Sequence, residues 1–218
     1  MTGERGGAGL SVLCDFDGTI TLIDTAEYIL EHYADGDWRG VDRLLSQGKI
    51  TIEECMKRQF EMISISRSTM MRELDAVVAP RPGFHGLLDH CWAGGRRLKI
   101  TSAGLDFYIW HFLEANRWDG LVDVVAPHVT DHGNGVYFRF PDKRNPLAHN
   151  FKEDEVLAER AAGRTVAYIG DGTSDLWAAM AADMAFAVKG SKLDRSLSKE
   201  KRNHHVFTDF SEVVDLLP

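Results

Sequence analysis

The sequence predicts an α/β fold in which a parallel β-sheet with crossover helices is interrupted by an inserted block of helices. Two observations carry this prediction. Short apolar runs alternate with helical segments over most of the chain, which is typical of strands joined by helical crossovers. The stretch 22–80 departs from this alternation, because it contains helical patterns and no strand. A length of 218 residues suits one core with a large insertion.

The first part of the chain predicts one strand and four helices. Residues 11–16 form a short apolar run that is typical of a buried strand. Thr51 and Glu54 have the spacing of a capping box and open the third helix. Pro80 and Pro82 end the helical block. The expected helices are 25–33, 37–47, 51–63 and 68–78.

The rest of the chain alternates helices and strands. Segments 122–127 and 135–140 flank a glycine-rich turn, and we expect them to pair as a β-hairpin. The other expected strands are 97–101, 165–169, 185–188 and 205–208. The expected helices are 83–93, 105–115, 153–162, 173–182 and 210–217. Residues 1–21 and 81–218 are therefore predicted to form the core, and residues 22–80 an inserted helical cap.

Composition excludes several classes of function. The chain has 25 Lys and Arg against 33 Asp and Glu, a net charge of −8. This acidity argues against nucleic acid or an anionic membrane surface as a partner. Its three cysteines form no CxxC pair, which favours reduced thiols. With no apolar run near the roughly 18 residues of a membrane span and no visible signal peptide, we expect a cytoplasmic protein.

Acidic residues follow two of the predicted strands. Asp15 and Asp17 are two apart in extended chain, so both side chains face one site, and Gly18 permits a tight turn after them. Asp171 and Asp175 follow the strand at 165–169. Carboxyl ends of parallel strands share one edge of the sheet, where ligands bind. Four carboxylates there need a cation, and their hard oxygens favour Mg²⁺.

A hydroxyl and a lysine complete this predicted site. Ser102 follows the strand at 97–101, and it is favoured over Thr101, which points into the sheet by alternation. Lys152 is favoured over Lys143 and Lys189, because it opens the helix before the next strand. A hydroxyl and an ammonium beside Mg²⁺ suit phosphoryl oxygens. An ionised Asp can attack phosphorus while the second carboxyl acts as general acid and base.

These motifs resemble those of the haloacid dehalogenase (HAD) superfamily of phosphatases, over essentially the whole chain and in the same order. DFDGT at 15–19 is similar to the first motif, Ser102 to the second, Lys152 to the third and GDGTSD at 170–175 to the fourth. The resemblance implies a Rossmann-like core with a parallel sheet.

The resemblance also implies roles for the motif residues. Asp15 would be the nucleophile and a metal ligand, and Asp17 the general acid and base with its carbonyl on the metal. Asp171 would bind Mg²⁺, and Asp175 would hold either the metal's water or Lys152. The phosphoryl group would be bound by Ser102, Lys152 and the backbone N–H groups of Phe16 and Ala103.

The helical insertion indicates the phosphoserine phosphatase-like branch, with a four-helix-bundle cap. CDFDGTIT at 14–21 and GKITIEECMKRQF at 48–60 look most like the MtnX-like phosphatases of methionine salvage. The resemblance implies that Asp24 binds substrate. The partner arginine of phosphoserine phosphatases falls at Gln59 in an ungapped reading, and Arg58 takes that place only if the register shifts by one residue.

We therefore expect a Mg²⁺-dependent phosphatase that acts on a small phosphorylated metabolite through an aspartyl-phosphate intermediate. A cap that closes over the site excludes bulk water and large polymers. Two alternatives stay open. The first is a phosphotransferase that passes the phosphoryl group to another small alcohol, and the second is a non-catalytic binding protein on the same scaffold. The identity of the substrate and the oligomeric state cannot be predicted from these motifs.

Overall fold

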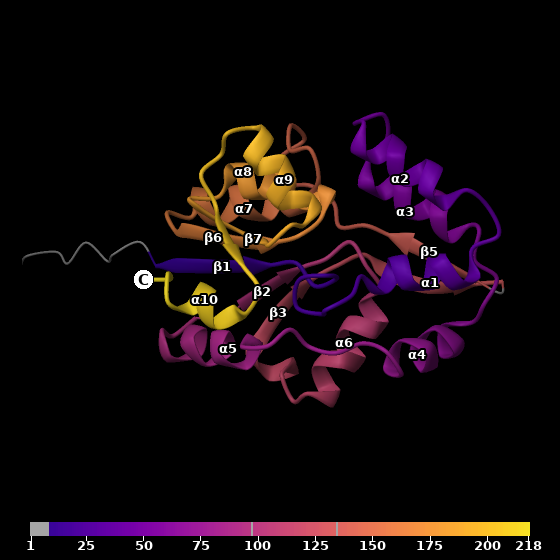
Figure 1. Cartoon of the computed structure of the whole chain (residues 1–218), viewed down its shortest axis with the longest axis horizontal. Coiled ribbons are helices and arrows are strands. Elements are labelled where there is room, and N and C mark those ends of the chain that lie inside the picture. The colour runs from indigo at the N-terminus through magenta and orange to yellow at the C-terminus, as the bar shows by residue number, and fades with distance from the viewer. Residues whose placement is uncertain (1–8, 97, 134) are drawn as a thin grey trace, which may run out of the picture.

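A parallel sheet of six strands lies at the centre of the structure, a computed structural model that describes residues 9–96, 98–133 and 135–218 (Figure 1). The strand order is β3-β2-β1-β6-β7-β8. Arg97, Asn134 and the first eight residues, which include parts of the predicted strand and turn, lie outside the described residues. The strands are β1 (Leu10–Cys14), β2 (Leu98–Thr101), β3 (Val122–Val125), β6 (Thr165–Gly170), β7 (Met184–Val188) and β8 (His205–Phe207).

The position of β1 at the centre of the sheet determines where a ligand can bind. β1 pairs in parallel with β2 on one side and with β6 on the other. The strand order therefore reverses at β1, and the helical connections on its two sides lead away from each other. This arrangement leaves a crevice beyond the carboxyl ends of these three strands. The predicted α/β fold with a parallel sheet is confirmed.

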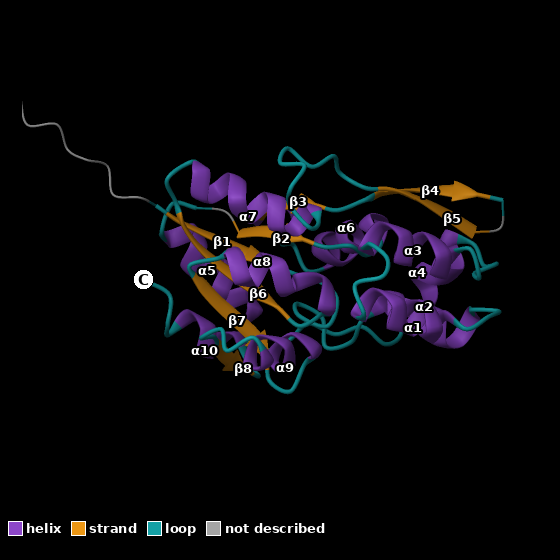
Figure 2. Ribbon diagram, turned by 90° about the horizontal axis from the view of Figure 1, so that it is seen from above, coloured by secondary structure: helices purple, strands orange, loops and turns teal. Residues whose placement is uncertain are grey.

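Helices cover both faces of the sheet (Figures 1 and 2). Alternation along the strands explains this, because Leu13 packs with Val156 and Tyr168 on one face, whereas Val12 and Cys14 belong to the core on the other. The first face carries α7 (Phe151–Ala161), α8 (Leu176–Ala181) and α9 (Lys192–Lys199). The second carries α5 (Phe84–Ala93), α6 (Asp106–Ala115) and α10 (Phe210–Val214). Short 3₁₀ turns are at Asp119–Leu121 and Thr173–Asp175.

Four short helices form the cap inserted between β1 and β2. Each is nine residues long and begins with a side-chain cap, Asp24, Asp37, Thr51 or Ser66, that accepts a backbone N–H of the first turn. Such a cap is worth about 1 kcal/mol, a large share of the stability of so short a helix. The helices are α1 (Thr25–Tyr33), α2 (Trp38–Ser46), α3 (Ile52–Phe60) and α4 (Arg67–Asp75).

The cap is joined to the core by two chain segments that lie side by side. Thr21 and Pro80 form an antiparallel bridge, and the N–H of Leu22 donates to the carbonyl of Ala79 at 3.0 Å. The N–H of Arg81 donates to the Ile20 carbonyl at 2.7 Å. This paired crossing places the cap over the carboxyl ends of the strands (Figure 1).

The predicted hairpin was wrong in one of its two strands. Residues 122–125 form β3, which pairs in parallel with β2, and the partner of β5 (Gly135–Arg139) is β4 (His128–His132). Alternating valines fit the edge of a buried sheet as well as a hairpin, and the sequence pattern did not separate the two. β5 packs against the cap, with the rings of Phe60 and Phe138 at 4.9 Å (Figure 2).

Some element boundaries also differ from the prediction, and one helix was missed. β1 ends at Cys14, so Asp15 already belongs to the loop. α7 begins at Phe151, because Asn150 caps it by accepting the N–H of Glu153 at 3.0 Å. Helix α9 was not predicted, although Ser191 caps it.

The predicted capping box on α3 is only half formed. Thr51 accepts the N–H of Glu54 at 3.2 Å, but the Glu54 carboxylate pairs with Arg58. In the part of the chain that the structure describes, no helix has both the length and the apolar character needed to cross a bilayer.

Candidate active site

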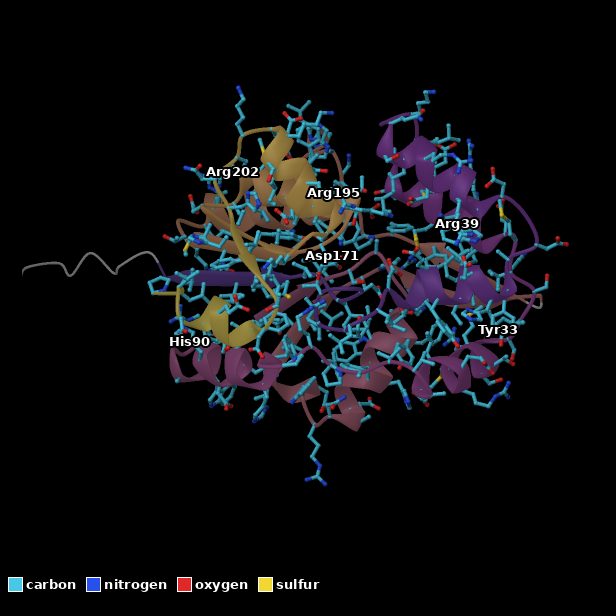
Figure 3. All side chains as sticks on the ribbon, in the orientation of Figure 1. Tyr33, Arg39, His90, Asp171, Arg195 and Arg202 are labelled. Carbon is cyan, nitrogen blue, oxygen red and sulfur yellow. The ribbon has the colours of Figure 1, made fainter. Side chains whose placement is uncertain are left out.

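A cavity of about 360 Å³ lies between the carboxyl edge of the sheet and the cap. We call it the cap cavity. Its core side is lined by the predicted carboxylates Asp15, Asp17 and Asp171 together with Lys152. Figure 3 labels Asp171 where the core faces the cap. The topology thus brings side chains more than 150 positions apart in sequence into one enclosed space.

Lys152 is held between two carboxylates at the floor of the site. Its Nζ lies 2.9 Å from Oδ1 of Asp15 and 2.7 Å from Oδ1 of Asp175, and the residue is only 1% exposed. Burial alone would lower the pKa of the Lys152 ammonium, but the two carboxylates raise it above its usual value. Lys152 is therefore charged at neutral pH. Neither rival lysine, Lys143 or Lys189, lines the cavity.

Asp175 is used to hold other groups in place. It accepts hydrogen bonds from Lys152, from Tyr168 Oη at 2.7 Å and from the N–H groups of Asp171 and Gly172. Burial acts to raise the pKa of Asp175, but Lys152, Tyr168 and the Gly172 amide bring it below its usual value. Its negative charge thus fixes the ammonium of Lys152 beside Asp15.

Asp171 lies against the loop that follows β1, where a glycine leaves room for its carboxylate. Its Oδ1 accepts from Thr19 Oγ1 at 3.0 Å. Gly18 has φ +69°, and a Cβ there would lie 2.6 Å from Oδ2 of Asp171. A side chain at Gly18 would therefore be strained and would push Asp171 away.

Asp17 is oriented by the cap as well as by the core. Its Oδ1 accepts from the N–H of Thr25 at 3.2 Å and from the Thr25 hydroxyl, and its Oδ2 accepts from Ser102 Oγ at 3.2 Å. Ser102 in turn accepts the N–H of Gly104 at 3.0 Å. Burial raises the pKa of Asp17, while the hydrogen bonds from Thr25 and Ser102 oppose that rise. A carboxyl group with a raised pKa suits proton transfer.

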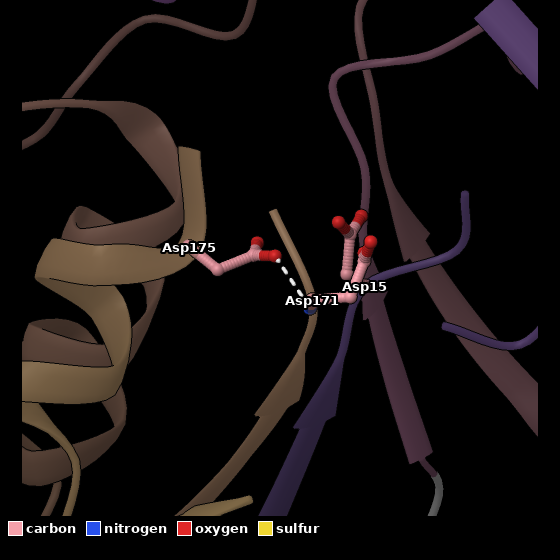
Figure 4. A group of neighbouring side chains, drawn as sticks. All are labelled: Asp15, Asp171 and Asp175. Carbon is pink, nitrogen blue, oxygen red and sulfur yellow. Dashed lines mark hydrogen bonds between the residues drawn. The ribbon is translucent and has the colours of Figure 1, made fainter. Parts of the chain in front are cut away.

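Three carboxylates at this site fit a divalent cation. Asp15, Asp171 and Asp175 each offer an oxygen, and these atoms lie within 4.8 Å of one another (Figure 4). Burial and the neighbouring Asp175 raise the pKa of Asp15 well above its usual value, and the same two causes raise that of Asp171 to about 7. One lysine thus leaves the cluster short of positive charge, and hard oxygen donors are the ligands that Mg²⁺ prefers.

Some of the remaining candidate residues line the cap cavity and others do not. Ala103 and Asp24 line the cap cavity, and Asp24 also caps α1. The N–H of Phe16, expected to bind phosphate, donates to Oδ1 of Asp15 at 2.8 Å. Arg58 does not line the cavity and lies on the exposed side of α3 beside Glu54, so the structure does not bring it to the other candidate residues. Gln59 is the residue of α3 that faces the cavity.

Sequence reasoning missed four residues that support the site. Thr25 donates a hydrogen bond to Asp17, and Tyr168 donates one to Asp175. The Arg81 guanidinium donates to the carbonyls of Gly18 and Thr19 at 2.7 and 2.8 Å. Asn150 donates to the Ser174 carbonyl at 2.7 Å. The asparagine could have been found as a helix cap, whereas the others carry no local sequence signal.

Relatives of the chain are found by sequence and by structure. It is 26% identical to Pdp3-interacting factor 1 of Schizosaccharomyces pombe, over 94% of this chain and 93% of that protein. It is also 26% identical to a 2-hydroxy-3-keto-5-methylthiopentenyl-1-phosphate phosphatase of Bacillus pumilus, over 94% and 88%. A substrate-bound phosphoserine phosphatase structure superposes with a TM-score of 0.72 at 16% identity, covering 99% of this chain and all of that one.

The structural likeness confirms the predicted fold. The family model for haloacid dehalogenase-like hydrolases matches residues 12–180, a range that includes the DFDGT and GDGTSD motifs. The resemblance inferred from the motifs is thereby confirmed, and the chain belongs to the haloacid dehalogenase-like hydrolase family.

Proposed function

We propose that the chain is a Mg²⁺-dependent phosphatase that hydrolyses a small phosphorylated metabolite through an aspartyl-phosphate on Asp15. The predicted class of enzyme, a phosphoric monoester hydrolase, is confirmed by the family match and by relatives named as phosphatases over nearly the whole chain. The observation that carries the finer proposal is the buried Lys152, held between Asp15 and Asp175 at the floor of the cavity. This geometry presents one carboxylate, with its counter-charge, to an incoming phosphoryl group.

In the first step, an oxygen of Asp15 attacks phosphorus and the bond from phosphorus to the ester oxygen breaks. Asp17 gives its proton to the departing alkoxide. Its raised pKa, caused first by burial, keeps a proton available, and Thr25 and Ser102 fix its direction. Lys152 and Ser102 neutralise or bind phosphoryl oxygens.

In the second step, water attacks phosphorus and releases inorganic phosphate from Asp15. Asp17, now ionised, takes the proton of that water and returns to its starting state. The same carboxyl group thus serves as acid and then as base, which requires that it reach both the leaving oxygen and the water. The hydrogen bonds from the hydroxyls of Thr25 and Ser102, which fix the Asp17 carboxyl at the cavity wall, support this role.

Asp15, Asp171 and the carbonyl of Asp17 would hold Mg²⁺, with Asp175 beside them. When bound, the ion supplies positive charge that lets neighbouring carboxylates ionise and offsets the charge on the phosphoryl oxygens. The carboxylate oxygens of Asp175 accept hydrogen bonds from Lys152, Tyr168 and two backbone amides. Its role in the proposed mechanism is therefore to hold Lys152 in place.

The cap limits the size of the substrate. A cavity of about 360 Å³ is of the order of known small-molecule sites, which supports a small metabolite as partner. A cytoplasmic location and the absence of a nucleic-acid partner stay predictions.

Release of an aryl alcohol from an aryl phosphate tests this proposal. We expect hydrolysis that depends on Mg²⁺ and falls by at least about 10³-fold in Asp15→Asn, because an amide is a poor nucleophile. Asp215→Asn, at an exposed aspartate of the C-terminus, is the control and should retain activity. Unchanged Mg²⁺-dependent turnover in Asp15→Asn would refute the mechanism.

A further inference from the structure

The cap wall of the cap cavity contains a buried amide whose oxygen is not used. Gln59 is 4% exposed and lines the cavity from α3. Its Nε2 donates to the carbonyl of Trp38 at 3.3 Å. A carbonyl can only accept, so this bond sets the orientation of the amide and leaves Oε1 on the other side. Among the described residues, Oε1 makes no hydrogen bond and is not fully enclosed, so a donor inside the cavity can reach it.

The acidic residues that line the cavity near Gln59 also favour a ligand with hydrogen-bond donors. Asp24 and Glu27 line the cavity beside α1, and neither has an ion-pair partner among the residues that the structure describes. Asp42 lines it from α2 and accepts from Lys192 at 3.1 Å. Burial and the neighbouring Asp17 raise the pKa of Asp24 to about 8, so the negative charge of this wall comes from Glu27 and Asp42, while Asp24 offers a carboxyl oxygen as an acceptor.

The cations that line the cavity in the described chain are all engaged. Arg81 donates to the backbone carbonyls of Gly18 and Thr19, Lys152 is held by two aspartates, and Lys192 is held by Asp42. A substrate carboxylate entering the cap would meet carboxylates and no free guanidinium. Burying such a charge unpaired costs several kcal/mol.

The rest of the cap wall is apolar, which gives a short carbon chain a surface to pack on. Its apolar lining residues include Leu30, Trp38, Leu45, Ile52, Cys55 and Met56.

We propose that the cap cavity receives a leaving group that carries a hydrogen-bond donor and no carboxylate, with Gln59 as the residue that reads the donor. The inference rests on the proposed function and narrows its substrate class to phosphate esters of small amino alcohols or diols. An ammonium and a hydroxyl share the donor chemistry, and the substrate series below distinguishes them.

Three esters of matched size, 2-aminoethyl phosphate, 2-hydroxyethyl phosphate and propyl phosphate, test the proposal together with the larger O-phosphoserine. We expect kcat/KM for at least one donor-bearing ester to exceed that for propyl phosphate by roughly tenfold, the worth of one good hydrogen bond. O-phosphoserine should rank below the donor esters, because it adds a carboxylate. An ammonium-reading site ranks the amine first, and a hydroxyl-reading site ranks the diol first.

Two substitutions at Gln59 assign the effect to this residue. Gln59→Met keeps the shape and removes the acceptor, so the ratio of kcat/KM for the better donor ester to that for propyl phosphate should fall about tenfold. Gln59→Arg places a guanidinium in the wall and should raise O-phosphoserine relative to the donor esters. Arg58→Gln, one residue away on the exposed side, should leave every ratio as in the wild type. If Gln59→Arg fails to fold, Gln59→Met decides.

The outcomes separate this inference from the proposed function. A chain that hydrolyses aryl phosphate but prefers O-phosphoserine, or whose substrate ratios are the same in Gln59→Met, overturns the inference alone. A chain that releases nothing from aryl phosphate with Mg²⁺ overturns both.

Discussion

Replacing Lys152 by methionine should destabilise the fold in a way that depends on pH. The ammonium lies 2.9 Å from Asp15 and 2.7 Å from Asp175, and all three side chains are buried. Methionine keeps the length of the side chain and removes the charge, which leaves two carboxylates close together without a counter-ion. Breaking a buried pair in this way costs about 3–5 kcal/mol.

Urea unfolding of wild type and Lys152→Met, both without Mg²⁺, measures this cost. For a chain of this length, 3–5 kcal/mol corresponds to a fall in Tm of about 6–20 °C. Lys189→Met is the matched control, because Lys189 is exposed and outside the cavity, and it should stay within about 0.5 kcal/mol of wild type.

The sign of the pH dependence gives a second check. In the wild type, Lys152 and the hydrogen bonds of Asp175 bring the pKa of that carboxyl below its usual value, so its stabilisation is present above the unfolded pKa and lost as pH falls. Without Lys152, burial raises the pKa of both carboxyl groups, and they gain protons at higher pH. The deficit of Lys152→Met should therefore be largest near pH 8 and shrink towards about pH 5. A deficit below about 1 kcal/mol at pH 8, or one that grows on acidification, would refute this reasoning.

Three further outcomes are expected. Mg²⁺ at a hundred times its Kd should stabilise the folded protein by about 2.7 kcal/mol and so raise its Tm. In a thermal scan, Asp171→Asn should abolish that rise. Because burial and Asp175 raise the pKa of Asp171 to about 7, Mg²⁺ competes with a proton there, and calorimetry should find its affinity falling as pH drops below about 7; a pH-independent affinity contradicts that competition. Thr25→Val removes a hydrogen bond that opposes the raised pKa of Asp17, so the limb of the pH–kcat profile that reports Asp17 should move to higher pH, with Thr25→Ser restoring it.

The sheet and the gathering of carboxylates at its carboxyl edge were predictable because their signals are local. Asp15 and Asp17 stand next to a strand that any reading finds, and parallel strands bring their carboxyl ends together without further information. The predicted helix cap Thr51 likewise acts on a residue three positions away. The motifs identify the candidate residues, and the topology of the parallel sheet brings these residues together.

The misplaced hairpin and the supporting residues had no such local signal. The strand β3 differs from a hairpin strand only in its partner, which lies more than 20 residues earlier in β2. Tyr168 looks like one more apolar residue of a buried strand, and its hydroxyl matters only because the 3₁₀ turn at Thr173–Asp175 brings Asp175 within 2.7 Å. Contacts of this kind depend on how two elements pack, and no spacing rule reports them.

The choice between Arg58 and Gln59, by contrast, was available in the sequence. The buried positions of α3 are Ile52, Cys55, Met56, Gln59 and Phe60, which follow the i, i+3, i+4, i+7, i+8 pattern of a helix face. Gln59 is the polar member of that stripe, and Arg58 lies about 100° away from it around the helix. Since Thr51 fixes where the helix begins, a shift that buries Arg58 would also bury Glu54 and would expose Met56 and Phe60. The packing of the cap therefore decides which side chain meets the substrate, and with it whether the wall of the cavity carries a guanidinium or a neutral amide.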